Sequence, residues 1–222
     1  MKKLKLKFKI DWKAKIADLL IVIIGITLAF RLDAWNEDRK ARKQLNHYLS
    51  SFQDETRENI KVLKKVIAIA TVRKQEVDTL RALLRKQRYG DRRLGLLSSK
   101  LTNTIDYRPT TITIEYIQES DGWGLIRDFR LRKNIIDAYN ALEDLEKMEQ
   151  GTQVYINSFV TPFFFNNIRY SNFYPVNDRE FITDHRFENV IIGYQFKLIY
   201  QLQNYALVLE QLQRLEKDLR NK

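Results

Sequence analysis

The residue with the sharpest chemical reading is Asp18, a carboxylate that directly precedes a charge-free run from Leu19 to Phe30. A carboxylate at the mouth of a membrane span can carry protons by cycling between its charged and neutral forms, and burial raises its pKa to allow that cycle. The simpler reading places Asp18 at the amino end of a helix, where the helix dipole favours negative charge and Lys15 lies one turn away. Both readings require a helix that begins near Asp18.

Other residue types that could perform chemistry are sparse. The two histidines, His47 and His185, fall on different predicted helices, and a zinc site would need Asp or Glu ligands from elsewhere. Gly122-Trp123-Gly124 is better explained as a turn between helices than as a phosphate cradle. No G-x-S-x-G or S-x-x-K motif occurs, and the chain has no cysteine for a disulfide, a thiolate ligand or a nucleophile. The sequence therefore predicts a non-enzyme with no catalytic residue, no cofactor, no metal site and no evident small-molecule substrate.

The stretch from Ile16 to Trp35 is predicted to cross a membrane as one helix. The charge-free run alone is too short to cross about 30 Å of hydrocarbon, so the span must include its charged ends. A helix of this length reaches roughly 30 Å at ~1.5 Å per residue. Arg31 can then extend its guanidinium to the lipid surface, and the tryptophans at positions 12 and 35 can lie at the two interfaces.

Two small residues, Gly25 and Ala29, lie four positions apart within the span and form a small-xxx-small pair that lets two helices approach closely. The side chains predicted to set the depth and packing of this helix are Asp18, Gly25, Ala29, Arg31 and Trp35. Membrane lipid is one expected partner. A protein partner in the membrane or envelope, or a second copy of the chain, is the other.

Lysine placement predicts the orientation of the span. Seven lysines and one acid precede it, so the positive-inside rule places the amino terminus in the cytoplasm and the rest outside, anchored in the inner membrane. The residues expected on the anionic lipid surface are Lys2, Lys3, Lys5, Lys7, Lys9, Trp12, Lys13 and Lys15. This tail holds +6 of the net charge of +11 (seven Lys minus Asp11), so the charge does not predict nucleic-acid binding. A cleaved signal peptide is the rival reading, although no small-x-small site follows the apolar run.

Residues 36 to 222 are predicted to form an extracytoplasmic, periplasmic helical bundle. No Gly or Pro occurs between Gly25 and Gly90, so the span should continue as one long helix that ends at Gly90. Its coiled-coil-like stripe consists of Leu45, Leu49, Phe52, Thr56, Leu63, Val66, Ala70, Val77, Leu80 and Leu84. Asn59 and Arg73 interrupt that register. Ile60, Ile67 and Ile69 widen the apolar face, which favours an antiparallel bundle over a two-stranded coil.

Later helices are marked by their caps. Thr111 should begin a helix that Gly122 ends as a left-handed cap, and Asp128 a helix that Gly151 stops. Asp184 should begin a final helix to about residue 219, long enough to return beside the first. Its predicted stripe is Ile191, Tyr194, Leu198, Leu202, Tyr205, Leu209, Leu212, Leu215 and Leu219. Helix 129–150 should bury Ile135, Ile136, Tyr139, Leu142 and Leu145. The aromatic run at 163–165 is read as the plug of a bundle end, with a binding surface as the alternative.

Several segments resemble a family of single-span membrane proteins of unknown function, domain of unknown function 6090, which is common in the Bacteroidota. The matching segments are the IVIIGITLAF run, the exit motif WNEDRK, YLSSFQDETRENIKVL at 48–63 and RPTTITIEYIQESDGWGLIRDFRLRKNIIDAYNAL at 108–142. The chain departs from the family at Asp18, where Glu is usual, and at Trp123, where a small or polar residue is usual. The resemblance implies an anchor and a bundle, and it implies no activity.

These observations predict an all-α protein with one N-terminal transmembrane helix, 16–35, between a basic tail, 1–15, and a bundle, 36–222. The leading hypothesis for its function is a scaffold or accessory subunit that binds another envelope protein. An ion-coupled, stator-like subunit that uses Asp18 is the alternative, although nothing after the span resembles a peptidoglycan-binding module. An enzyme is the third hypothesis.

Overall fold

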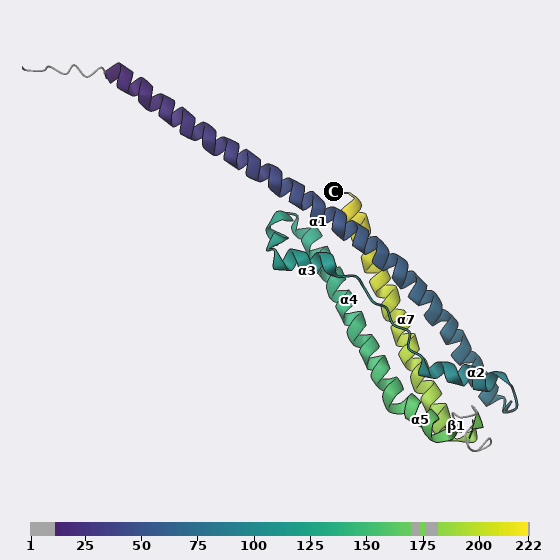
Figure 1. Ribbon diagram of the computed structural model, residues 1–222. Helices are drawn as coiled ribbons and strands as arrows, with labels where there is room; N and C mark the ends of the chain where they lie inside the picture. The colour runs from purple at the N-terminus through teal and green to yellow at the C-terminus, as the bar shows by residue number, and fades with distance from the viewer. Residues whose placement is uncertain (1–11, 170–173, 176–181, 222) are drawn as a thin grey trace, which may run out of the picture. The chain divides into compact units, whose positions relative to one another are not determined.

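The computed structural model describes residues 12–169, 174–175 and 182–221 (Figure 1). The chain divides into two compact units, Met1–His47 and Tyr48–Lys222. Helix α1, Trp12–Arg85, contributes residues to both. Residues 1–11 of the predicted tail, 1–15, lie outside the described residues.

Helix α1 runs for 74 residues without a break, as the lack of Gly and Pro after Gly25 predicts. Its end differs from the prediction, because the helix stops at Arg85 rather than at Gly90. Gln87 takes the left-handed backbone conformation there, with φ of 52°, and no described glycine has a positive φ. Its amide donates to the Leu84 carbonyl at 2.9 Å, so a hydrogen-bonded turn ends the helix before the glycine is reached.

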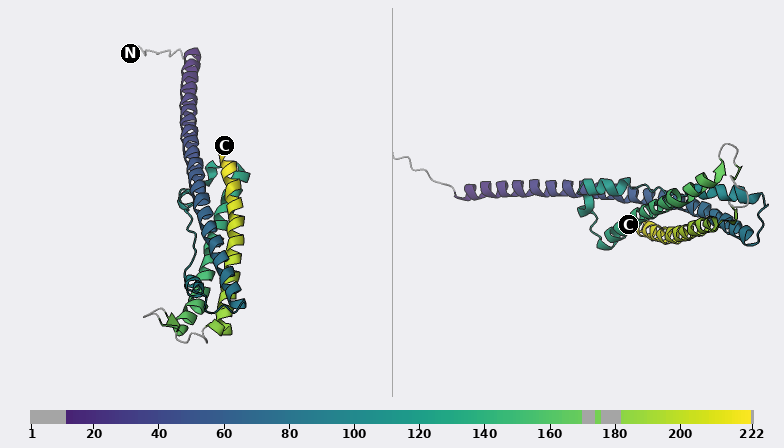
Figure 2. Two further views of the ribbon diagram at one scale, coloured as in Figure 1. Left: turned by 90° about the vertical axis from the view of Figure 1, so that its right-hand side faces the viewer. Right: turned by 90° about the horizontal axis from the view of Figure 1, so that it is seen from below.

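Three long helices form the second unit: the part of α1 from Tyr48 onward, α4, Phe129–Tyr155, and α7, His185–Arg220 (Figures 1 and 2). Helix α7 is antiparallel to both others, since rising residue numbers in α1 and α4 meet falling numbers in α7. The pairs that show this are Arg57 with Glu216 and Arg81 with Gln195 for α1, and Asn134 with Asp218 and Tyr155 with Val190 for α4. The predicted all-α fold, with the final helix packed antiparallel to the first, is confirmed.

Short elements connect the long helices. Between α1 and α4 lie α2, Arg93–Ser99; the 3-10 turn η1, Lys100–Thr102; α3, Ile112–Glu119; and η2, Gly122–Leu125. A π-helical turn, η3, Ile156–Val160, continues α4 into α5, Thr161–Asn167. The two-residue strands β1, Ile168–Arg169, and β2, Tyr174–Pro175, pair antiparallel.

The core follows the predicted helical stripes closely. In α1 the buried apolar residues are Tyr48, Phe52, Ile60, Leu63, Val66, Ala70, Val77, Leu80 and Leu83. In α7 seven predicted positions are buried, and Phe187, Val190, Gln201 and Val208 join them. Two predicted core residues are wrong: Ile69 is 55% exposed, and Ile136 is at the surface with 36% exposed. Both lie at the edge of their stripe, where a straight helix of 3.6 residues per turn rotates them away from the core.

The predicted caps Asp128 and Asp184 are confirmed, and each carboxylate accepts a backbone N–H in the first turn of its helix. Gly122 is not the left-handed cap, because Asp121 takes that conformation with φ of 51°. Gly122 instead allows a close approach, since a Cβ there would lie 2.9 Å from the Tyr48 ring. Gly151 does not stop α4, which continues to Tyr155. A helix tolerates an interior glycine at a cost of about 1 kcal/mol when packing holds it.

The aromatic run closes one end of the bundle, as predicted, with two of its three rings. Phe163 and Phe164 are buried, and both contact Phe187 at centroid distances of 5.6 and 6.2 Å. Phe165 is 66% exposed. Stacked and edge-to-face rings of this kind stabilise a core beyond the area that they bury.

Replacing Gly193 of α7 by alanine should lower the free energy of unfolding by about 1 to 3 kcal/mol. The new Cβ would lie 2.6 Å from the Tyr155 Cζ and closer still to its hydroxyl, so the ring must move. That movement breaks the 3.1 Å hydrogen bond from Tyr155 to the Val190 carbonyl. Urea unfolding measures the loss. In a Tyr155→Ala background the same change should cost less, and an equal cost would contradict the collision.

Candidate functional site

The first unit presents an apolar helix whose surface the rest of the chain leaves open. Among the described residues, an 18-residue window of the helix from Leu19 onward has a mean hydropathy of 1.7, and none of that window is buried. By length and composition the helix is able to cross a membrane. The large apolar side chains from Ile16 to Trp35 are 49% exposed or more.

The residues predicted to set the depth of the span all lie on α1. Gly25, Ala29 and Arg31 are exposed, and a Cβ added at Gly25 would meet nothing within 4 Å in the described chain. Trp35 is 61% exposed, and the Arg39 guanidinium lies 5.7 Å from the centre of its ring. That cation–π contact is suited to a membrane–water interface, where the guanidinium stays hydrated and the indole ring lies at the level of the lipid headgroups. The side chain of Asp18 lies outside the described part of the structure.

Most of the predicted lipid-surface lysines also fall outside the described part. Five of them precede the first described residue: Lys2, Lys3, Lys5, Lys7 and Lys9. Lys13 lies within α1, but its side chain is also outside the described part. Trp12 begins α1 and is 71% exposed, and Lys15 is exposed one turn later.

The second unit contains a feature that the helical pattern does not show: residues 103–111 form neither helix nor strand, yet they run against the bundle. We call them the clamped segment. Because backbone groups away from water need hydrogen-bond partners, such a segment must find them outside a helix or sheet. Side chains from α1, α4 and α7 provide them.

The side-chain amide of Asn59 in α1 pairs with the backbone of the clamped segment as a neighbouring β-strand would. Its Nδ2 donates to the Thr110 carbonyl, and its Oδ1 accepts from the Thr110 amide, both at 2.8 Å. The Tyr107 hydroxyl donates to the Asn59 carbonyl at 3.3 Å. Asn59 is 2% exposed, so this pair of bonds is well shielded from water.

Glu55, one turn before Asn59, joins three helices. Its carboxylate accepts hydrogen bonds from the Thr113 amide at 2.9 Å, from the Thr113 hydroxyl at 2.8 Å and from the Tyr139 hydroxyl. Thr113 lies in α3 and Tyr139 in α4, and Glu55 itself is 8% exposed. Burial, and then the hydrogen bond to Glu55, raise the pKa of Tyr139, so its hydroxyl keeps its proton and donates.

Glu149 of α4 holds the middle of the clamped segment. A single carboxylate oxygen, Oε1, accepts from the Tyr107 amide at 2.8 Å and from the Tyr205 hydroxyl of α7. Burial raises the pKa of Glu149 to about 6, an effect that these two hydrogen bonds oppose and that Asp106 and Glu146 reinforce. Gln201 donates to the Ile105 carbonyl at 3.2 Å from the same side.

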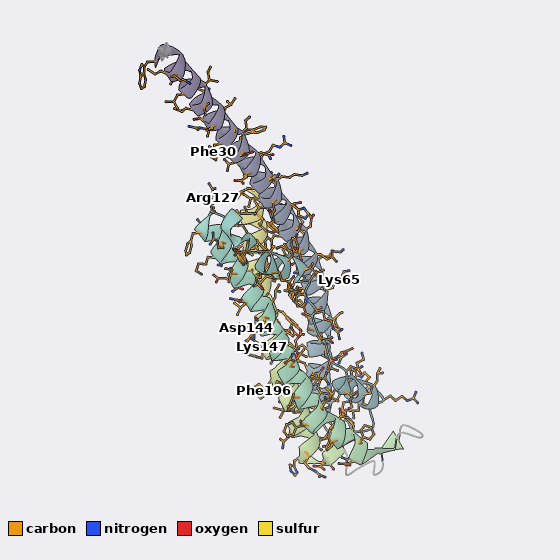
Figure 3. The ribbon with its side chains drawn as sticks, turned by 60° about the vertical axis from the view of Figure 1, so that its left-hand side comes forward. Phe30, Lys65, Arg127, Asp144, Lys147 and Phe196 are labelled. Carbon is orange, nitrogen blue, oxygen red and sulfur yellow. The ribbon has the colours of Figure 1, made fainter. Side chains whose placement is uncertain are left out.

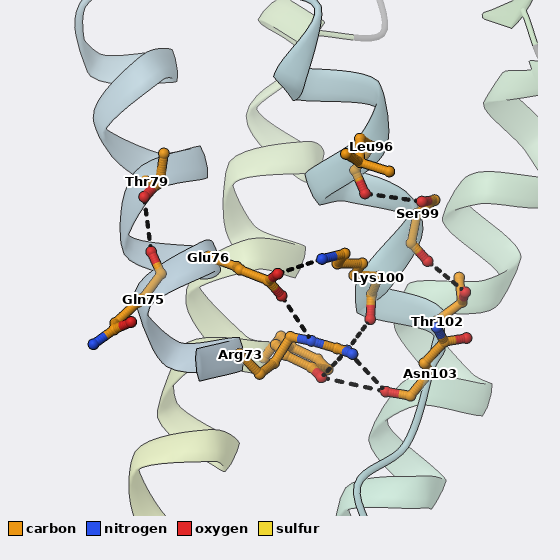
Figure 4. Close-up of polar contacts among 10 residues, drawn as sticks. Arg73, Gln75, Glu76, Thr79, Leu96, Ser99, Lys100, Thr102 and Asn103 are labelled. Atoms are coloured by element: carbon orange, nitrogen blue, oxygen red, sulfur yellow. Dashed lines mark hydrogen bonds and ion pairs between the residues drawn. The ribbon is translucent and has the colours of Figure 1, made fainter. Parts of the chain in front are cut away.

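Arg73 of α1 secures the start of the segment (Figure 4). Its guanidinium donates to the carbonyls of Lys100 and Asn103 and to the Tyr194 hydroxyl of α7, and it pairs with Glu76 at 3.3 Å. The Lys100 ammonium pairs with the other oxygen of Glu76. The Glu76 carboxylate is therefore the counter-ion of both Arg73 and Lys100 within the network.

The described residues line one cleft beside the clamped segment and another at the start of α4 and the end of α7. One, of about 590 Å³, is lined by the clamped segment, α4 and Gln201, and Glu149 reaches it. The other, of about 780 Å³, lies between α4 and α7 and is lined by three aspartates and by Arg130, Arg214 and Lys217.

Within the described residues no group of three His, Asp or Glu side chains is placed to hold a metal ion. His47 and His185 are both exposed, and His185 lies 3.6 Å from Asp184. The polar side chains that hold the clamped segment, among them Asn59, Arg73 and Glu149, chiefly bind the chain's own backbone.

The raised pKa of Glu149 predicts an unusual pH dependence. Because the folded state binds this proton more tightly than the unfolded chain, the group's stabilising contribution is complete below about pH 4.5 and is lost as pH rises through about 6. The loss is up to about 2 kcal/mol for a shift of this size. Glu149→Gln keeps Oε1 as acceptor and cannot ionise, so its stability relative to the wild type should rise by up to that amount between pH 4.5 and 7.5. Urea unfolding of both proteins across this range measures the difference, and parallel curves would contradict the assignment.

The sequence signalled part of this site. Asn59 and Arg73 interrupt the heptad register of α1. Asn59 holds Thr110 of the clamped segment, and Arg73 holds Asn103 of that segment and also donates to Tyr194 of α7. A polar residue inside an apolar stripe was therefore the available signal. Glu55, Glu149 and Gln201 were missed, and Gln201 carried the same signal within the α7 stripe.

Comparison with known proteins gives no match among family models, curated proteins or solved structures.

Proposed function

We propose that this protein is a membrane-anchored scaffold or accessory subunit, held by residues 16–35 and binding another protein through its span and its helical bundle. The observation that carries the proposal is that none of the apolar window of α1 is buried among the described residues. Apolar surface costs roughly 25 cal/mol per Å² in water, so this helix needs lipid or another protein around it. The positive-inside rule gives the direction: basic tail in the cytoplasm, bundle outside.

The polar groups of the second unit support a binding role over a catalytic one. The main polar side chains form their hydrogen bonds within the chain, with its backbone or its tyrosines; they are Glu55, Asn59, Glu149 and Arg73. A catalytic acid or base needs to reach a substrate proton at hydrogen-bond distance. Here the polar groups instead stabilise one conformation of the segment between α2 and α3, and hence one shape of the bundle surface.

Three measurements test the proposal. The full-length protein should stay with membranes after carbonate washing, and a reporter fused to its last residue should be active only outside the cytoplasm. Chemical cross-linking in intact membranes, then purification in mild detergent and mass spectrometry, should recover a stoichiometric companion or a homo-oligomer. A carbonate-soluble protein or a cytosolic reporter would refute the anchoring, and a monomer recovered alone would refute the accessory role.

Asp18→Asn separates this proposal from the ion-coupled alternative. A scaffold should keep both assembly and cellular function when Asp18 loses its charge, because its role depends on surfaces. A proton-coupled subunit should assemble normally and lose function, since asparagine cannot cycle between charged and neutral forms. Detergent purification and growth of a complemented deletion strain give the two readouts.

A further inference from the structure

Helix α7 carries a row of exposed side chains on the face turned away from the core: Phe196, Tyr200, Gln203 and Leu207, which we call the outer stripe. Phe196, Tyr200 and Leu207 are 69%, 57% and 59% exposed. Spacings of three and four residues place the four side chains on one helical face. The opposite face bears the buried residues Tyr194, Leu198, Gln201, Tyr205 and Val208.

Three of the four outer-stripe residues, Tyr200, Gln203 and Leu207, lie in a part of α7 without charge, since no Asp, Glu, Lys or Arg occurs between Lys197 and Glu210, and Phe196 directly precedes it. The outer face of α4 is different: Lys133 pairs with Asp137, and Lys147 with Glu143 at 2.8 Å. Figure 3 shows Phe196 beside this charged helix, with Asp144 and Lys147 labelled on α4. An uncharged, aromatic-rich helix face is the composition of an interface core, whereas ion pairs are typical of a solvated face.

We propose that the outer stripe pairs with the outer stripe of a second copy of this chain. An uncharged face requires an uncharged partner face, because a buried unpaired charge is costly, and α7 presents such a face in every copy. In a two-fold dimer the residues beside the axis meet their own copies. Gln203 is the polar residue within the stripe, and its amide both donates and accepts, so a pair of Gln203 side chains can satisfy each other at the axis.

The area of the stripe indicates how strong this pairing is. Its large side chains can bury on the order of a few hundred Å² per copy, below the roughly 800 Å² per partner of a standard stable complex. Pairing therefore depends on confinement, and two copies anchored in one membrane meet at a raised effective concentration. This step rests on the anchoring proposed above. The dimer should form in membranes and dissociate when detergent-solubilised protein is diluted.

Because the chain contains no cysteine, single-cysteine variants test the pairing directly. Gln203→Cys in native membranes, oxidised with copper phenanthroline, should give a disulfide-linked band at twice the chain mass. Asp144→Cys on the exposed face of α4, where the side chain is 77% exposed, is the matched control and should give several-fold less. Equal cross-linking of both variants, or a product with another protein in place of the dimer, would overturn the proposal.

Charge placed in the stripe gives the second readout. In the Gln203→Cys background, Phe196→Glu should reduce the dimer band several-fold, while the Lys147→Glu control on α4 should leave it unchanged. Both side chains are exposed, so neither change removes a core contact, and circular dichroism checks the fold. An undiminished band in Phe196→Glu would overturn the pairing.

Carbonate washing of the same membranes distinguishes the two proposals. A carbonate-resistant protein whose Gln203→Cys variant does not cross-link refutes the α7 dimer and leaves the anchor standing. A carbonate-soluble protein refutes the anchor, and cross-linking of the purified full chain at high concentration then decides the dimer by itself, with the same Asp144→Cys control.

Discussion

Glu55→Ala should lower the free energy of unfolding by about 3 to 5 kcal/mol, the largest stability effect that we expect from a single polar substitution in this protein. The change removes the acceptor for the Thr113 amide, the Thr113 hydroxyl and the Tyr139 hydroxyl together. All three donors would then be left unpaired where water is largely excluded, since Thr113 is 7% and Tyr139 is 6% exposed. Urea-induced unfolding in mild detergent, followed by circular dichroism, measures the loss.

The two controls for Glu55→Ala are a conservative substitution at the same position and the truncation of a solvent-exposed neighbour, Glu58. Glu55→Gln retains one acceptor oxygen and should cost less than Glu55→Ala. Glu58→Ala, one turn along on the solvent side, removes only an exposed ion pair with Lys61 and should cost less than about 1 kcal/mol. A Glu55→Ala protein as stable as Glu58→Ala would show that the carboxylate does not hold α1, α3 and α4 together.

Ile24→Arg should move most of the protein out of the carbonate-resistant membrane fraction. A charge near the centre of a span costs about 2.5 to 3.5 kcal/mol, or roughly a hundredfold in the insertion equilibrium. The predicted span is marginal, because its charge-free run covers only Leu19 to Phe30 and charged residues already occupy both ends. Carbonate fractionation followed by immunoblotting measures the shift.

The matched control is Ile69→Arg, the same substitution on the same helix in the second unit. Ile24 is 64% and Ile69 is 55% exposed within the chain, so the two positions differ mainly in the solvent that we expect around them. Ile69→Arg should leave both membrane retention and stability close to wild type. Equal fractionation of the two variants would mean that residue 24 does not lie in lipid.

Much of the fold could be predicted from the sequence because the helical period of its apolar residues is a local feature of the chain. The apolar repeats of α1 and α7, the absence of Gly and Pro after Gly25, and the caps Asp128 and Asp184 each act within a few residues along the chain. Those features determine that the protein is helical, where its long helices lie and which faces are buried. The apolar composition of residues 19–30 likewise marks the part of α1 that the rest of the chain leaves exposed.

Only the tertiary structure decided the path of the clamped segment and the role of the polar residues that hold it. Asn59 and Thr110 are 51 positions apart, Glu55 and Tyr139 are 84 apart, and Tyr205 and Glu149 are 56 apart. Periodicity marks Asn59 as an interruption but cannot name its partner, because a side-chain amide binds any backbone that the fold brings to it. The helix ends show a second limit, since Gln87 and Asp121 take left-handed conformations although Gly90 lies three residues after the first and Gly122 directly follows the second. Local propensity determined which helices form, and long-range hydrogen bonding and packing determined what crosses between them.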